Sequence, residues 1–153
     1  MIEIRAARAE DCRNVWAWRN DSETRAASFN GEAIPFDRHE AWFKSRLAGR
    51  ETRIFIALDA RGREVGYVRF NVAGENAEVS VALDAAERGK GVGPAAIRAA
   101  VEALLADRAI NRVTALVKCS NPSSARAFEK AGFLLQGKRR VGEDEALEWA
   151  RLR

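Results

Sequence analysis

Hydrophobic and polar residues alternate along several short segments of the chain, as they do in strands that bury one face. The clearest example is Ala77–Leu83, in which Val79 and Val81 share one face while Glu78 and Ser80 share the other. Six further segments are predicted to be strands: Ile2–Ala6, Arg53–Leu58, Glu64–Val72, Val113–Lys118, Phe133–Arg139 and Ala146–Leu152. The chain is therefore expected to build a sheet of about seven strands.

Helices are predicted where apolar residues recur every three or four positions. These four helices cover Ala9–Asn20, Arg38–Leu47, about Gly93–Asp107, and a segment that Asn121 and Pro122 open and Gly132 ends. In the first helix, Arg19 lies on the same side as the apolar Val15. Asp37 is expected to cap the second helix, because an aspartate side chain accepts hydrogen bonds from the free amides of a helix start. The intervening stretch Ser22–Pro35 is expected to be irregular, since it carries Gly31 and a proline.

The order of these elements is strand, two helices, three strands, helix, strand, helix and two strands. This order predicts an α+β fold with a mixed sheet crossed by helices. The 153 residues are expected to form one domain, 1–153. A composition of 47% hydrophobic and 31% charged residues is typical of a globular chain and argues against disorder.

The sequence favours a cytoplasmic protein without a membrane partner. No apolar run approaches the roughly 20 residues of a membrane span. The residues that follow Met1 lack the charged and then apolar layout of a secretion signal. Cys12, Cys119 and the single His39 are too few for a disulfide scaffold or a typical metal site, so no metal is expected.

The net charge of +4 raises the question of a nucleic-acid partner. Arginine supplies 21 of the 26 positive residues, and these arginines are scattered along the chain. The longest basic run is only Lys138, Arg139 and Arg140. Because a nucleic-acid interface needs positive charge clustered on one face, no nucleic-acid partner is expected.

A glycine-rich segment separates the strand Ala77–Leu83 from the longest helix. Its residues are Arg88, Gly89, Lys90, Gly91, Val92 and Gly93. Glycines let the backbone turn and approach a ligand closely, and free amides at a helix start bind anions such as a pyrophosphate. Arg88 and Lys90 add positive charge where such an anion would lie. The spacing differs from that of a Walker loop or a dinucleotide fingerprint, so a solvated glycine turn is the alternative.

A second motif, about thirty residues further on, favours the anion-binding interpretation. It follows the pattern Asn-x-x-Ser-x-x-x-Phe-Glu-x-x-Gly-Phe, at Asn121, Ser124, Phe128, Glu129, Gly132 and Phe133. Together with Arg88, Gly91 and Gly93, this motif makes the whole chain resemble the GNAT-type N-acetyltransferases. The resemblance implies a mostly antiparallel sheet whose fourth and fifth strands splay around acetyl-CoA. It also implies acetyl-CoA as the donor and a primary amine as the acceptor.

The resemblance assigns the residues that would hold acetyl-CoA. They are Val81, Ala82 and Leu83 of the strand, the loop from Arg88 to Gly93, and Asn121, Ser124, Phe128 and Lys130. The family usually carries an amide-bearing residue after the last glycine, where this chain has Pro94. Proline cannot donate a hydrogen bond but suits the first turn of a helix, so binding is expected to survive with weaker affinity. Many members dimerise, which leaves a homodimer as an open alternative.

Direct acetyl transfer needs a base for the amine and an acid for the leaving thiolate. Similar family members carry a glutamate base near the strand position of Glu78, which is expected to be partly buried; the alternative is a surface glutamate. Many relatives use a tyrosine acid where this chain has Phe128. The remaining candidates are Tyr67, Ser80, Ser124 or a solvent proton. Tyr67 is also explained as a packing aromatic. A covalent route through Cys119 is disfavoured, because the family generally transfers directly.

The acceptor is expected to bind between the first helices, the loop that joins them and the strand Glu64–Val72. The candidate residues are Arg25, Phe29, His39, Trp42 and Arg69. The runs at residues 18–20 and 39–43 resemble acetyltransferases of the pseudaminic acid pathway, which acetylate the 4-amino group of a UDP-linked aminosugar. Cationic side chains would bind the diphosphate and rings would stack on the uracil. The alternatives are a protein N-terminus or small free amine as acceptor, and a CoA-binding module without catalysis.

Overall fold

The computed structural model describes residues 1–153 and contains one seven-stranded sheet with the order β1-β2-β3-β4-β5-β7-β6. The strands are β1 (Glu3–Ala6), β2 (Thr52–Leu58), β3 (Glu64–Ala73), β4 (Asn76–Leu83), β5 (Arg112–Lys118), β6 (Leu134–Val141) and β7 (Asp144–Leu152). The helices are α1 (Cys12–Asn20), α2 (Ser22–Ala27), α3 (Phe36–Ala48), α4 (Val92–Leu105) and α5 (Pro122–Lys130). The expected α+β fold with a mixed, mostly antiparallel sheet is confirmed, since only the β4–β5 pair is parallel.

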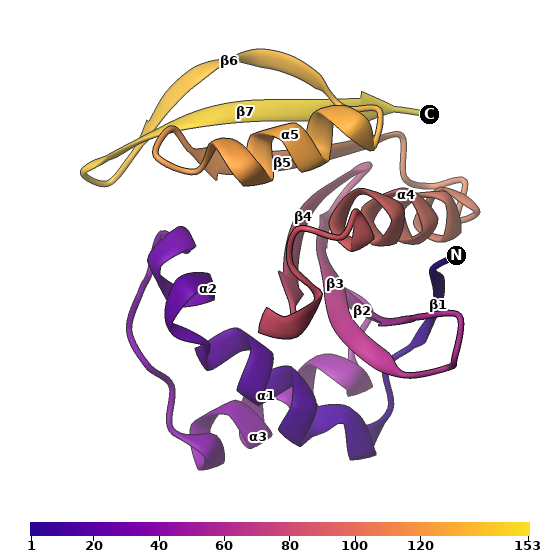
Figure 1. Cartoon of the computed structure of the whole chain (residues 1–153). Helices are drawn as coiled ribbons and strands as arrows, with labels where there is room; N and C mark the ends of the chain where they lie inside the picture. The colour runs from indigo at the N-terminus through magenta and orange to yellow at the C-terminus, as the bar shows by residue number, and fades with distance from the viewer.

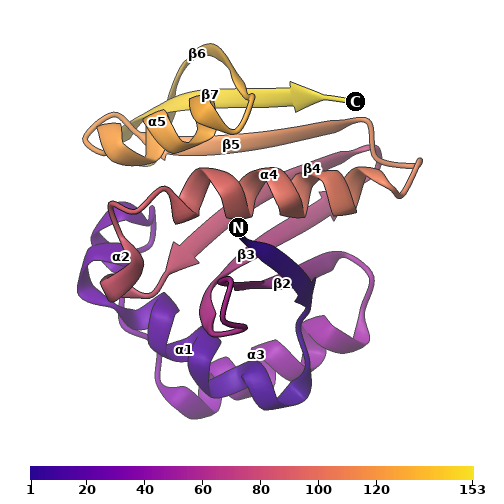
Figure 2. The same cartoon turned by 45° about the vertical axis from the view of Figure 1, so that its right-hand side comes forward.

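Helices cover both faces of the sheet (Figure 1 and Figure 2). A larger core of 20 buried residues joins α4 and α5 to one face and includes Val79, Ile97 and Phe133. A smaller core of 7 buried residues joins α1 and α3 to the other face and includes Val15 and Tyr67. The alternation of side chains along the strands supplies one set of residues to each core.

The β4–β5 pair creates the opening in the sheet that matters for function. The two strands are paired only where Asn76–Glu78 meets Arg112–Thr114, and they diverge beyond that point. β5 continues in register with β7 instead, from Arg112 to Lys118. Peptide groups of β4 and β5 beyond the paired segment are therefore available to a ligand, because neither strand satisfies the other there. The predicted splay of the fourth and fifth strands is confirmed.

One helix, α2, lies inside the segment that was expected to be irregular, so the protein has five α-helices where four were predicted. The side chain of Asp21 caps α2 by accepting hydrogen bonds from the amides of Glu23 and Thr24, both at 3.2 Å. α2 has no buried residue. A helix this short and exposed has no apolar periodicity, which is why the pattern did not predict it.

The predicted cap of α3 is wrong by two residues. Pro35 occupies the N-cap position, and Asp37 lies inside the first turn, where its carboxylate accepts a hydrogen bond from the amide of Arg38 at 3.0 Å. Asp37 still stabilises the helix, because a negative charge is favoured near a helix N-terminus. None of the helices combines the length and the apolar character that a membrane crossing needs.

Candidate active site

A cavity of about 1220 Å³ lies where β4 and β5 diverge. The glycine loop and α5 line one part of it, and residues of α1, α3 and β3 line another. Of the residues predicted to hold acetyl-CoA, all but one lie in its wall: Val81, Ala82, Leu83, Arg88, Gly89, Gly91, Val92, Gly93, Asn121, Ser124, Phe128 and Lys130. Lys90 is the exception, with an exposed side chain whose Nζ lies 3.8 Å from a carboxylate oxygen of Glu87.

The glycine loop has the backbone shape of an anion cradle. Gly89 and Gly91 have φ angles of 75° and 79°, a region that other residues adopt only with strain. Gly91 is the N-cap of α4, and no side chain caps the free amides that follow it. Pro94 is the third residue of α4, where a missing amide costs the helix no hydrogen bond. The loop therefore fits the pyrophosphate of acetyl-CoA.

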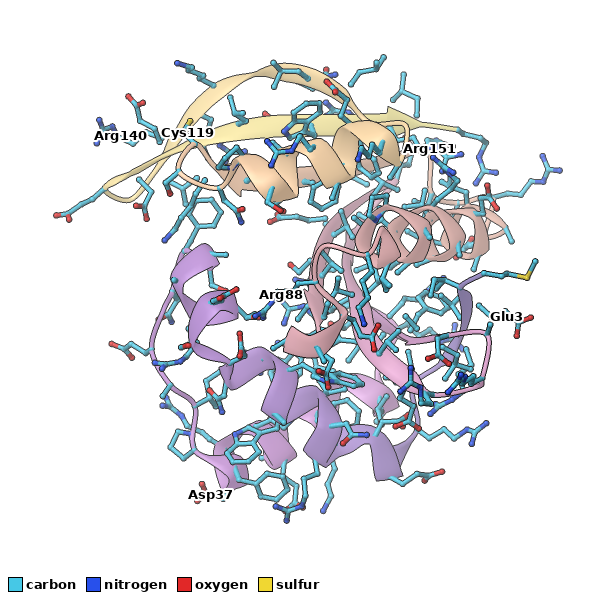
Figure 3. The ribbon with its side chains drawn as sticks, in the orientation of Figure 1. Glu3, Asp37, Arg88, Cys119, Arg140 and Arg151 are labelled. Carbon is cyan, nitrogen blue, oxygen red and sulfur yellow. The ribbon has the colours of Figure 1, made fainter.

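Arg88 lies between the glycine loop and α2 (Figure 3). Its guanidinium donates hydrogen bonds to Asp21 at 2.5 Å, Glu23 at 2.9 Å and Thr24 at 3.2 Å. The hydrogen bond from Arg88 is the main reason that the pKa of Asp21 is lowered. Arg88 therefore ties α2 to the cofactor loop, a contact that the motif itself does not indicate.

The start of α5 forms the opposite wall of the cavity. The side chain of Asn121 accepts a hydrogen bond from the amide of Ser124 at 3.2 Å, which is the helix cap that the sequence predicted. Phe128 is 3% exposed, and its ring lies edge-on to Phe133 with centroids 5.2 Å apart. Phe128 thus contributes its edge to the cavity and most of its surface to the core.

Glu78 occupies the point at which β4 leaves β5. Its neighbours across the sheet are Asn71 on β3 and Thr114 on β5, and its carboxylate forms no ion pair. Glu78 is exposed rather than partly buried, because the cavity opens at this point of the strand. A water molecule or an amine can therefore reach the carboxylate directly.

The other candidate proton donors differ in their surroundings. Tyr67 lines the cavity but is only 4% exposed, and its ring stacks on Trp18 with centroids 6.4 Å apart. Burial raises the pKa of Tyr67, and the nearby Arg69 and Arg19 partly oppose this effect. Ser124 lines the cavity from the first turn of α5. Cys119 is exposed just beyond β5 (Figure 3) and is absent from the cavity wall.

Three cross-strand pairs of β3 and β4 lie beneath α1 and α3, and all of their residues except Asn71 line the cavity. The cross-strand pairs are Tyr67 with Ala82, Arg69 with Ser80, and Asn71 with Glu78. Arg19 of α1 and His39 and Trp42 of α3 also line the cavity. The predicted residues Trp42 and Arg69 are therefore brought together.

His39, a predicted acceptor contact, is buried and hydrogen-bonded within the protein. Its side chain has no exposed surface, and its Nε2 donates to the carbonyl oxygen of Cys12 at 3.0 Å. Its Nδ1 accepts a hydrogen bond from Arg19 at 3.3 Å. Burial and the charge of Arg19 lower the pKa of His39, so the ring is neutral near pH 7. His39 orients Arg19, which the sequence analysis places in the run at residues 18–20 but not among the candidate acceptor residues.

Arg25 and Phe29 belong to the segment that closes the cavity. Arg25 donates to the carbonyl oxygens of Asn20 at 3.1 Å and Gly31 at 3.4 Å, and so holds the turn after α2. Lys118 of β5 donates to the carbonyl oxygen of Ala26 at 3.0 Å, and its Nζ lies 5.9 Å from the Phe29 ring. These contacts join the α2 segment to β5 across the cavity.

A glycine loop with uncapped amides beside the diverging strands β4 and β5 is the arrangement that a CoA-dependent acyltransferase needs. Residues 2–134 match the acetyltransferase (GNAT) domain family. The chain therefore belongs to the GNAT family, and it is an acetyl-CoA-dependent N-acetyltransferase. No group of three histidine, cysteine, aspartate or glutamate side chains is arranged to hold a metal ion.

The chain is similar to N-acetyltransferases with different acceptors. It is 28% identical over 152 residues to Aminoglycoside N(6')-acetyltransferase type 1 of Klebsiella pneumoniae, a match that covers 89% of this chain and 75% of the relative. It superimposes on AAC(6')-Ib in complex with ribostamycin and coenzyme A with a TM-score of 0.87 and 25% identity, covering 99% and 93% of the two chains. The spermidine N-acetyltransferase from Vibrio cholerae in complex with CoA and spermine shares the fold, with a TM-score of 0.87, 19% identity, and coverage of 99% and 95%.

None of these relatives is an enzyme of the pseudaminic acid pathway. The narrower resemblance, with a UDP-linked aminosugar as acceptor, is therefore not supported by the comparisons. The predicted homodimer stays a prediction.

Proposed function

We propose that the protein acetylates the primary amine of a small molecule that binds beneath α1 and α3, opposite the glycine loop. The observation that carries this proposal is the single cavity in which both regions meet. Its wall includes Gly91 and Ser124 on the cofactor side and Trp42 and Arg69 on the other, and Glu78 also lines it, on the cross-strand pair next to that of Arg69. An amine and a thioester bound in this cavity would meet near Glu78.

Acetyl-CoA supplies an activated thioester when it is bound. Glu78 would take a proton from the ammonium form of the acceptor, directly or through water, so that the nitrogen lone pair can form the new C–N bond. The C–S bond breaks as this bond forms, and the thiolate must gain a proton. The exposure of Glu78 supports this assignment, because the carboxylate is accessible and has no competing cation.

The acid that protonates the thiolate would be Tyr67 or Ser124, or a solvent proton. Phe128 carries no ionisable group, which removes the donor that many relatives use. Tyr67 is oriented by its stacking on Trp18 and is buried, so a packing role explains it equally well. Ser124 stands at the N-terminal turn of α5, where a developing negative charge is favoured.

Relatives are named for acting on aminoglycosides and spermidine, whereas the sequence suggested a UDP-linked amino-dideoxy sugar. The test is release of free CoA from acetyl-CoA with a panel of amines: a UDP-4-amino-4,6-dideoxy sugar, kanamycin, spermidine and a short peptide. A blank without acceptor corrects for reaction of the thiol reagent with the two cysteines.

Acceptor-dependent CoA release with one of these small molecules, together with an acetylated product by mass spectrometry, is the expected result. Turnover of the UDP-linked sugar alone would establish the narrower acceptor. Turnover of the peptide alone would contradict the proposed small-molecule acceptor and favour a protein N-terminus.

A further inference from the structure

Two guanidinium groups lie against one aromatic ring on the acceptor side of the cavity. The Cζ of Arg19 on α1 is 4.4 Å from the ring centre of Trp42, and the Cζ of Arg69 on β3 is 5.4 Å from it. Most ion pairs of this protein join arginines to carboxylates, as in Arg53–Asp107 at 2.8 Å. Neither Arg19 nor Arg69 has an acidic partner.

The two cations are also incompletely hydrogen-bonded. The Nε of Arg69 is buried without any hydrogen-bond partner, and its Nη2 reaches only the Ser80 hydroxyl at 3.4 Å. Arg19 donates to the neutral His39 ring at 3.3 Å. Burial lowers the pKa of Arg19 most, Arg69 lowers it further, and Tyr67 opposes the shift. Partly buried cations without a counter-ion are costly, and an anion bound to them would reduce that cost.

The position of the pair relates it to the proposed reaction. Arg19, Trp42 and Arg69 line the main cavity and also an adjoining hollow of about 320 Å³. The cross-strand pair Arg69–Ser80 lies next to the cross-strand pair Asn71–Glu78. Successive residues on one face of a strand are roughly 7 Å apart, so the arginine pair and Glu78 are separated by the length of a small molecule.

We propose that Arg19 and Arg69 form an anion-binding subsite, and that the acceptor carries a phosphate or carboxylate about one sugar ring away from its amine. The inference rests on the proposed acetylation of a small-molecule amine and names the class of that amine. Guanidinium groups bind such anions through paired N–H donors, and the Trp42 face supplies a flat surface beside them. The adjoining hollow is lined by three arginines, Arg19, Arg46 and Arg69, and by one acidic residue, Glu51, so its charge favours an anion.

The kinetic test compares acceptors that differ only in the anionic group, at saturating acetyl-CoA. Glucosamine 6-phosphate is compared with glucosamine, and 6-aminohexanoate with its amide, so that phosphate and carboxylate are tested separately. Wild type is expected to favour at least one anionic member by roughly tenfold to a hundredfold in kcat/KM, the range of hydrogen bonds to charged groups. Arg69→Gln is expected to reduce that preference to near one with an unchanged KM for acetyl-CoA.

Arg61→Gln is the matched control. Arg61 is exposed in the β2–β3 turn and lines neither cavity, so this substitution removes the same charge outside the site. A wild type without any preference for the anionic members, or an Arg69→Gln protein that behaves like Arg61→Gln, would overturn the inference. If free phosphate accelerates the acetylation of unphosphorylated glucosamine, the site binds a free anion and not an anionic group of the acceptor. This result would also overturn the inference.

A binding measurement keeps the subsite testable apart from turnover. The CoA-loaded protein, with its glycine loop occupied, is titrated with pyrophosphate while tryptophan fluorescence is followed. Saturable binding by wild type and Arg61→Gln, weakened at least about tenfold in Arg19→Gln and Arg69→Gln, supports the subsite. Equal binding by all four proteins contradicts it. If no amine is acetylated while this pattern is found, the proposed function fails and the anion subsite stands.

Discussion

The two sides of the cavity present different kinds of groups to a ligand. On the cofactor side, the glycine loop and the diverging strands present backbone amides and carbonyls, with Gly89 and Gly91 in conformations that permit this. On the acceptor side, the groups that face the cavity are side chains, chiefly Arg19, Trp42 and Arg69. A backbone site can be recognised from a glycine and asparagine motif, whereas a side-chain site depends on which residues the fold brings together.

Two arginines illustrate the same difference. Arg88 beside the glycine loop has three partners on α2 and is held in place by them. Arg69 on the acceptor side has a buried nitrogen with no partner. The first has a structural role that the protein satisfies internally, and the second is left for a ligand to satisfy.

The largest effect is expected from Glu78→Gln, because it removes the carboxylate that we propose as the general base. Loss of a general base lowers kcat by about 10²–10⁴-fold. The KM for acetyl-CoA should stay unchanged, since Glu78 lies away from the glycine loop. Steady-state kinetics across acetyl-CoA concentrations would measure both quantities. Glu75→Gln, in the exposed β3–β4 turn, is the control; equal rates for the two variants would exclude Glu78 as the base.

A smaller effect, confined to the cofactor side, is expected from Gly91→Ala. A Cβ at Gly91 meets no atom within 4 Å, so the cost arises from the φ of 79° alone, about 1–2 kcal/mol. Relief of this strain would move the amides of the loop and weaken CoA binding about tenfold. Isothermal titration with CoA would measure this change.

Gly62 offers a matched comparison for that experiment. It has a φ of 77° and equally open surroundings in the turn between β2 and β3. Gly62→Ala should lose similar stability in urea unfolding while keeping wild-type affinity for CoA. Unchanged CoA affinity in Gly91→Ala would show that the loop conformation does not determine cofactor binding.

The smallest effect concerns stability on the acceptor side. The pKa of His39 is lowered from 6.5 in the folded protein, so the unfolded chain takes up the proton first as the pH falls. The free energy of unfolding should therefore decrease below about pH 6.5, by at most about 1.4 kcal/mol per pH unit. His39→Gln should flatten this slope in urea unfolding between pH 7.5 and 5.5. An identical slope in the two proteins would show that His39 protonates equally in both states.

The sequence predicted most of the fold, because the alternation of side chains along the strands and the apolar side of α4 are patterns within short segments. It missed α2, whose six residues bury nothing and depend on the Asp21 cap. On the cofactor side the motif identified the wall of the cavity apart from Lys90. On the acceptor side the sequence named His39 as a contact and did not single out Arg19. No local pattern shows which partners a side chain acquires across α1, α3 and β3.

The separation of donor and acceptor recognition is tested most directly in the variants Gly91→Ala and Arg69→Gln. The KM for acetyl-CoA and the kcat/KM of the best acceptor are measured in both. Gly91→Ala is expected to raise only the KM for acetyl-CoA, and Arg69→Gln is expected to lower only the kcat/KM of the acceptor. Two variants that each change both quantities to the same extent would contradict the separation of donor and acceptor recognition between the two sides of the cavity.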